Sequence, residues 1–109
     1  MKSFGDRVAL LPHLGIGVST EYGAHRAHNS LDIEALRAAY PQFSAFLEVG
    51  VEVDKGLDED TLRWVQAGRP TTYHFLDVNL DDPADQDALW LSAVSHVADT
   101  LRPAWLCGD

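Results

Sequence analysis

A histidine in the middle of an apolar segment is the residue of this sequence with the clearest potential for chemistry. His74 lies in the run from Thr71 to Leu80, which begins as a β-branched and aromatic stretch and becomes acidic toward its end. Two acids, Glu48 and Glu52, lie four residues apart in an earlier segment that alternates between apolar and polar residues. Imidazole and carboxylate groups are suitable ligands for metal cations, so these residues predict a metal site.

Each of these residues also has a structural interpretation. In this interpretation, His74 is a hydrogen-bonded histidine of the core, and Glu52 is a solvated residue at a strand end. Glu48, which lies deeper in its strand, is then a structural residue paired with a Lys or Arg. Cys107 is expected to be a small buried apolar residue.

The charge of the chain excludes several classes of function. Only 8 basic residues stand against 17 acidic ones among 109 residues, a net charge of −9, which disfavours nucleic acid and anionic membranes as partners. No apolar run approaches the roughly 20 residues of a membrane-spanning helix, and the first residues do not resemble a signal peptide. The single cysteine forms no internal disulfide and suits a reducing compartment, so we expect a cytoplasmic protein.

The elements that must position His74 and the two acids alternate along the chain. Glycines, prolines and capping residues divide it into helices that begin near Ser30, Asp58 and Asp82 and end near Pro41, Gly68 and Pro103. Strands are predicted over 14–19, 46–53, 71–80 and 104–109.

The resulting order, βαβαβαβ, implies parallel strands with right-handed crossovers. Since a barrel of eight such units takes about 250 residues, we predict an α/β fold in which residues 1–109 form a single partial domain, the first half of a TIM (β/α)8 barrel. The alternative is a small open four-stranded sheet that is complete in itself.

The pleat of the strands indicates which side chains share a face. Glu48 and Glu52 lie on the face opposite Leu47 and Val49, and His74 is expected to join them. Carboxylates gathered on one buried side need a cation or a proton, which again favours a metal. Polar residues at the strand ends would support the ligands; they are Asp77, Asn79 and Asp109.

Three motifs resemble a known family. The segments 14–18, 46–52 and 72–75 are similar to the opening of the multinuclear non-haem iron enzymes of ribosomal-peptide biosynthesis, the family of MbnB and TglH. The resemblance implies a xylose-isomerase-like barrel that binds two or three iron ions and oxidises cysteine in a precursor peptide, with a small partner protein that presents the peptide. It also implies that Glu48 and Glu52 correspond to a pair of acids in the second strand, and His74 to an iron ligand.

The chain departs from this family in two places. Val53 and Asp54 follow the second acid where the family tends to have Asn and an aromatic residue. Cys107, Gly108 and Asp109 stand where the family usually has a Ser-acid-His motif whose histidine is a further ligand. We therefore expect the chain to begin a metal site that it does not finish, and to be inactive by itself.

Two hypotheses follow from the sequence. The first is the amino-terminal part of an iron-dependent oxidase or oxygenase that modifies cysteine in a precursor peptide, with His74 and Glu52 as iron ligands. The alternative is a non-catalytic truncated α/β module that forms a homodimer through its open sheet edges or helps to present a peptide.

Overall fold

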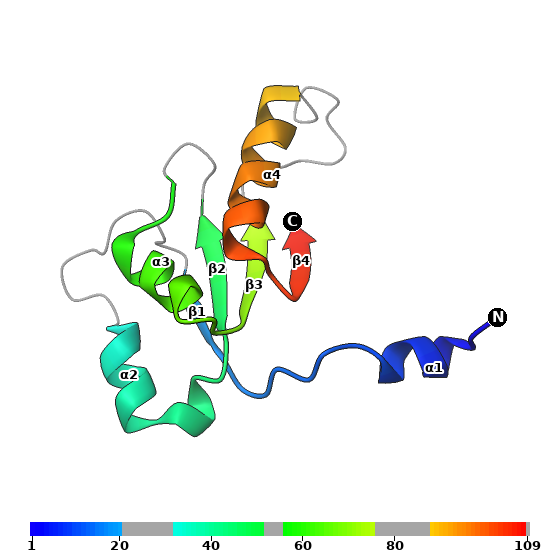
Figure 1. The fold of residues 1–109 in the computed structure, drawn as a ribbon, viewed down its shortest axis with the longest axis horizontal. Helices are drawn as coiled ribbons and strands as arrows, with labels where there is room; N and C mark the ends of the chain where they lie inside the picture. Colours follow the sequence, from blue (N-terminus) through cyan, green and yellow to red (C-terminus); the bar gives the residue numbers. More distant parts are fainter. Residues whose placement is uncertain (21–31, 52–55, 76–87, 109) are drawn as a thin grey trace.

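Four strands lie side by side, in chain order, in one parallel sheet (Figure 1). The computed structural model describes residues 1–20, 32–51, 56–75 and 88–108. Its strands are β1 (Val18–Thr20), β2 (Leu47–Val51), β3 (Thr71–Phe75) and β4 (Trp105–Gly108). The predicted α/β order of parallel strands is confirmed. Strand β1 begins later than predicted because Gly15 has a φ of 85°, a left-handed conformation that interrupts an extended chain.

Helices alternate with these strands. They are α1 (Phe4–Ala9), α2 (Ile33–Ala39), α3 (Glu59–Gln66) and α4 (Ala88–Leu101), with a short 3-10 helix η1 (Pro41–Phe43) after α2. The start predicted for the last helix, at Asp82, lies outside the described residues. None of the described helices is both long and apolar enough to cross a membrane.

The predicted boundaries of α3 are confirmed, whereas the predicted cap of α2 is wrong. In α3, Oδ1 of Asp58 accepts a hydrogen bond from the backbone N–H of Thr61 at 2.8 Å, and Gly68 ends the segment with a φ of 74°. Helix α2 is capped by Asp32 rather than Ser30. Oδ1 of Asp32 accepts from the N–H groups of the second and third helical residues, both at 3.1 Å, which places the helix start at Ile33.

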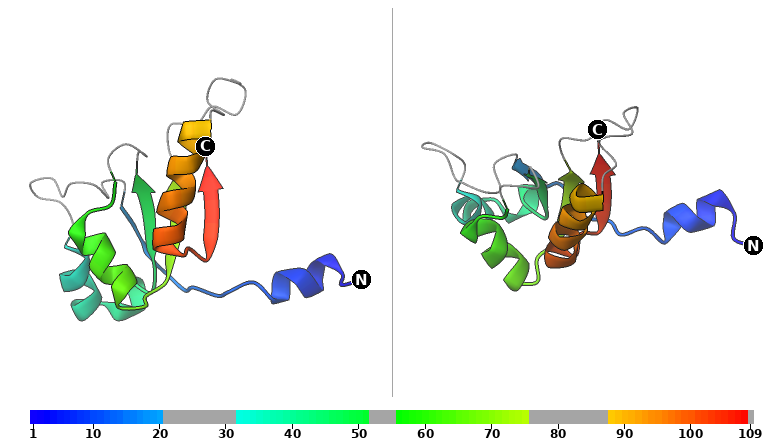
Figure 2. Two further views of the ribbon diagram at one scale, coloured as in Figure 1. Left: turned by 45° about the horizontal axis from the view of Figure 1, so that its top comes forward. Right: turned by 90° about the horizontal axis from the view of Figure 1, so that it is seen from above.

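Among the described residues, the buried apolar core lies on one face of the sheet. Helices α3 and α4 cover this face (Figure 2), and Ile33 adds a residue of α2 to the same core. The core residues are Ile33, Leu47, Val49, Trp64, Tyr73, Val97 and Leu101. Right-handed crossovers that always advance to the next strand place every crossover helix on the same side, which explains the one-sided core.

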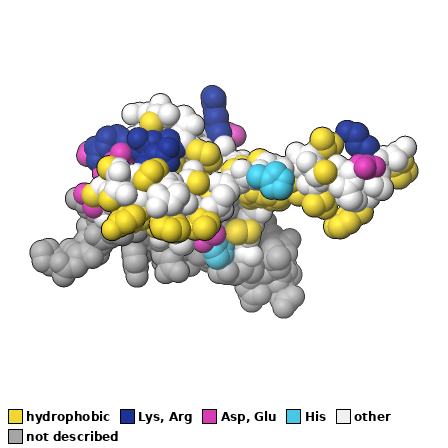
Figure 3. Space-filling model, turned by 90° about the horizontal axis from the view of Figure 1, so that it is seen from below, with side chains coloured by type: hydrophobic (Ala, Val, Ile, Leu, Met, Phe, Trp, Pro, Cys, Tyr) yellow, Lys and Arg dark blue, Asp and Glu magenta, His cyan; other side chains and the backbone are white. Residues whose placement is uncertain are grey.

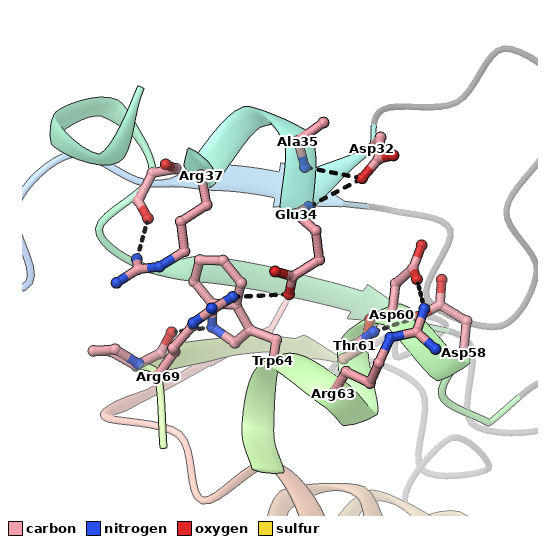
Figure 4. A network of polar contacts seen from close by, with 12 residues as sticks. Asp32, Glu34, Ala35, Arg37, Asp58, Asp60, Thr61, Arg63, Trp64 and Arg69 are labelled. Carbon is pink, nitrogen blue, oxygen red and sulfur yellow. Dashed lines mark hydrogen bonds and ion pairs between the residues drawn. The ribbon is translucent and has the colours of Figure 1, made fainter. Parts of the chain in front are cut away.

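Trp64 joins α2 and α3 to the start of β3 (Figure 4). Its side chain is 1% exposed, and its Nε1–H donates a hydrogen bond to the carbonyl oxygen of Pro70 at 2.9 Å. The guanidinium groups of Arg37 and Arg69 each lie 5.2 Å from its ring centre, a cation–π distance. Arg69 also pairs with Glu34 of α2 at 2.8 Å. This cluster holds the amino-terminal end of β3 in place.

The first residues form an arm that projects away from the sheet (Figure 1). Helix α1 was not predicted, although Ser3 and Asp6 form a capping box around its first turn. Every residue from Met1 to His13 is exposed. The arm contributes to a radius of gyration of 15.3 Å, against about 13 Å expected for a compact domain of this length.

Candidate metal site on the open face of the sheet

The face of the sheet opposite the core has a different character. Parallel register pairs Ser19 with Glu48, Glu48 with Thr72 and Thr72 with Trp105, so these side chains form one row. Two residues further along the strands, Gly50, His74 and Cys107 form a second row. We call this surface the open face; its side chains are Ser19, Glu48, Thr72, His74, Trp105 and Cys107. No described helix packs on it.

The predicted placement of His74 and Glu48 on one face is confirmed by this register. His74 is half-buried in β3, and Glu48 lies one strand away in the preceding row. Because the strand neighbour of His74 on the β2 side is Gly50, no side chain stands between the imidazole and the space above β2 in that row.

Glu48 accepts a hydrogen bond from a hydroxyl group, and the described residues include no basic partner of the kind that the sequence led us to expect. The Ser19 hydroxyl donates a hydrogen bond to Oε1 of Glu48 at 3.0 Å, from β1 to β2. Among the ion pairs of the described residues, none involves Glu48. A carboxylate on this face can bind a cation or a hydrogen-bond donor.

Thr72 adds a polar group in need of a partner. Its side chain is 8% exposed, and its Oγ1 is buried without a hydrogen-bond partner among the described residues. Register places it next to Glu48 in the first row and two residues before His74. An unpaired buried hydroxyl is costly in free energy, so the open face has polar capacity that its described residues do not use.

The structure describes only part of the predicted site. Glu52, Asp77, Asn79 and Asp109 lie outside the described residues, so their predicted roles are untested. Cys107, expected to be buried, is exposed instead, because β4 is an edge strand and has a neighbour on one side only. Sequence reasoning did not identify Ser19 or Thr72, since only the strand register shows that they adjoin Glu48.

The described residues fit a metal only in part. Within the described ranges, no three His, Cys, Asp or Glu side chains gather closely enough to hold an ion. His74 and Glu48, on neighbouring strands, offer one imidazole and one carboxylate, two groups that can bind metal cations. A complete site needs ligands beyond these two.

The comparisons with known proteins add no relative. No protein-family model matches the chain, and neither a curated protein nor a solved structure matches it. The family resemblance accordingly depends on the three sequence motifs alone.

Proposed function

We propose that this chain is the amino-terminal half of a (β/α) barrel, and that its open face is the interior of the barrel. One observation carries this proposal: the strand order is β1-β2-β3-β4, and the core formed by the described residues lies on one face. A doubly wound sheet reverses its strand order and places helices on both faces, whereas a (β/α) barrel keeps its order and leaves the inner face without helices.

The same observation supports a proposal for a metal site. In a closed barrel, His74 and Glu48 would face the interior, and Glu52 would follow Glu48 toward the carboxyl end of β2, where barrel active sites lie. We propose that His74 and Glu52 bind iron and that Glu48, held by Ser19, supports them together with Asp77, Asn79 and Asp109.

The chemistry proposed for the site comes from the motif resemblance. Bound iron would supply activation of O₂ for the oxidation of a cysteine thiolate in a precursor peptide, which a small partner protein presents in the cytoplasm. The residues of this chain would bind the metal and fix its position. The net charge of −9 suits a site that collects cations.

Metal analysis tests this proposal directly. The 109-residue chain, purified without oxygen and equilibrated with ferrous iron, is expected to retain iron after gel filtration, and the His74→Ala variant is expected to lose most of it. His96→Ala is the matched control, because His96 is an exposed residue of α4, outside the sheet. Equal iron in the native chain and in His74→Ala would contradict the proposal.

A non-catalytic interaction module is the second candidate. All four residues of β4 are exposed, and an exposed edge strand is a ready template for pairing with another chain. A chain that binds no iron but pairs through β4 would favour this function over the first.

A further inference from the structure

The described residues include two exposed apolar regions and two edge strands, β1 and β4, each with one neighbour in the sheet. The first region is the arm. Phe4, Val8 and Leu11 recur at helical spacing, and their side chains are 75%, 44% and 41% exposed. An isolated helix of six residues is unstable in water, so an arm with this stripe and a capping box is suited to packing on another surface.

The second region lies at the amino-terminal end of the strands. Ile16, Tyr40 and Phe43 are 59%, 53% and 52% exposed. Two backbone hydrogen bonds keep these segments near one another. The N–H of Ala45, which follows η1, donates to the carbonyl oxygen of Ile16 at 2.8 Å, and the N–H of Phe43 donates to the carbonyl oxygen of Tyr40 at 3.0 Å. We call Ile16, Tyr40 and Phe43 the amino-end patch. Figure 3 views the molecule from this end and shows hydrophobic side chains exposed both on the arm and on the body.

Charge complementarity identifies another copy of the same chain as a suitable partner for the arm. Residues 1–17 contain Lys2 and Arg7 against Asp6, a net charge of +1. The other residues contain six basic and sixteen acidic side chains, a net charge of −10. A basic arm is attracted to an acidic body, while two such bodies without arms would repel each other.

The backbone groups at the edges of the sheet can also pair with a second copy of the chain. The N–H of Ala104 donates to the carbonyl oxygen of Thr71 at 2.8 Å, and successive residues of a strand direct their backbone groups to opposite sides. The backbone groups of Trp105 therefore point away from β3, toward the open edge. Strand β1 has β2 as its one neighbour in the sheet, so each molecule has two edges that can accept a parallel strand.

We propose that two copies of this chain close into one eight-stranded barrel around a two-fold axis parallel to the strands. Strand β4 of each copy pairs with β1 of the other, which keeps all eight strands parallel. Each arm crosses beneath the barrel, on the side toward which it projects past β4 (Figure 1), and packs its stripe on the amino-end patch of the other copy.

This assembly would complete the proposed metal site, and in that respect it rests on the proposed function. The open faces of both copies become the common interior, so that His74 and Glu48 of each copy face those of the other. Two imidazoles and at least two carboxylates then share one cavity, which is a fuller donor set for iron than a single copy provides.

The mass of the particle in solution tests the assembly first. Sedimentation equilibrium of the purified chain at tens of micromolar is expected to give twice the chain mass of 12.0 kDa. Replacing two stripe residues, as Phe4→Ser and Val8→Ser together, is expected to weaken the dimer by roughly 100-fold or more, because four buried side chains are lost per dimer. A monomeric native chain would overturn the proposal.

The matched control is Gly5→Ser, on the same helix. A Cβ at Gly5 meets only the Ser3 hydroxyl, at 3.8 Å, so this change adds a polar group to the arm without touching the stripe. The control is expected to dimerise like the native chain. Circular dichroism of all variants checks that the body remains folded, and equal affinity of the stripe variant and the control would contradict the arm exchange.

Two measurements test how the edges pair. The N–H of Trp105 is expected to exchange with solvent slowly in the dimer and quickly after dilution to monomer. Mild oxidation separates the closed barrel from a side-by-side β4–β4 dimer. A disulfide needs Cα atoms about 4.4–6.8 Å apart, which opposite strands of a barrel do not allow. A disulfide formed readily between the two Cys107 residues would therefore overturn barrel closure.

The outcomes also separate the assembly from the proposed function. A closed dimer that binds no iron supports the assembly and contradicts the metal site. A monomer that binds iron through His74 supports the metal site and contradicts the assembly.

Discussion

The buried hydroxyl group of Tyr73 leads to a quantitative prediction about the core. The side chain is 0% exposed, and its oxygen finds no hydrogen-bond partner among the described residues. The ring itself is well placed, at 6.1 Å from that of Phe75 in an edge-to-face arrangement. Tyr73→Phe keeps this ring and removes only the hydroxyl.

The expected effect of Tyr73→Phe follows from the cost of that unpaired group. Leaving a buried hydroxyl without a partner costs about 1–3 kcal/mol. We therefore expect the variant to raise the free energy of unfolding by about 1–2 kcal/mol, with a rise in Tm of about 5 °C for each kcal/mol. Tyr40→Phe is the matched control at concentrations low enough to keep the chain monomeric, since Tyr40 of the single chain is 53% exposed and water reaches its side chain. A change within about 0.5 kcal/mol is expected there.

Urea denaturation monitored by circular dichroism measures both variants. The midpoint is expected to rise for Tyr73→Phe with an unchanged slope, because the surface exposed on unfolding is nearly the same. A loss of stability in Tyr73→Phe would refute the reasoning, since it would show that the hydroxyl makes a favourable interaction in the fold.

The pH dependence gives a second test of the same group. Burial raises the pKa of Tyr73 above its ordinary value of 10.0. Below pH 10 the hydroxyl keeps its proton in both states, and stability is unaffected. Above this pH the unfolded chain loses the proton first, so the free energy of unfolding falls by about 1.4 kcal/mol per pH unit until the raised pKa is reached. Tyr73→Phe is expected to lack this part of the alkaline loss, and parallel curves for both proteins would contradict it.

Substitutions at three further positions test the local interactions that define the fold. Trp64→Phe loses the hydrogen bond to Pro70 and part of the cation–π contacts. We therefore expect the free energy of unfolding, measured by thermal denaturation, to fall by about 1–3 kcal/mol. An unchanged Tm would contradict the role given to the indole. Asp58→Ala removes the cap of α3 and is expected to cost about 1 kcal/mol, whereas Asp58→Asn should retain most of it. Arg102 has a φ of 48°, a left-handed conformation that favours glycine, so Arg102→Gly is expected to raise stability by up to about 1 kcal/mol, and a decrease would show that its side chain stabilises the end of α4.

The parts of the fold that could be predicted from the sequence are those with local signals. Asp58 and Gly68 delimit α3 because a cap and a left-handed glycine act within one turn of the chain. The order of strands and helices followed from alternation of such signals. Helix α1 was missed although Ser3 and Asp6 carried a capping signal, and the start of α2 was misplaced because Ser30 and Asp32 are both suitable caps. Which of the two caps the helix depends on the backbone conformation at the helix start and not on residue type.

For the candidate site, the sequence could predict which side chains share a face of the sheet, because the pleat of a strand determines this. Alternation placed Glu48 and His74 on one face, and the register of β2 and β3 confirms this placement. The hydrogen bond from Ser19 to Glu48 and the position of Thr72 depend on which residues of neighbouring strands are paired, which no short motif specifies. The exposure of Cys107 depends on β4 being an edge strand.

Because the described core lies on one face of the sheet, alternate residues of each strand have different roles. In β3, the side chains of Thr71, Tyr73 and Phe75 serve the packing against helices, while those of Thr72 and His74 lie on the face without helices. Substitutions at the first set act on the packing against the helices, and substitutions at the second act on the face that carries Glu48 and His74. A saturation mutagenesis screen that scores folding and ligand binding separately should show tolerance that switches at every residue along β2 and β3. Such a strand can acquire new chemistry one residue at a time while the neighbouring residues keep it folded.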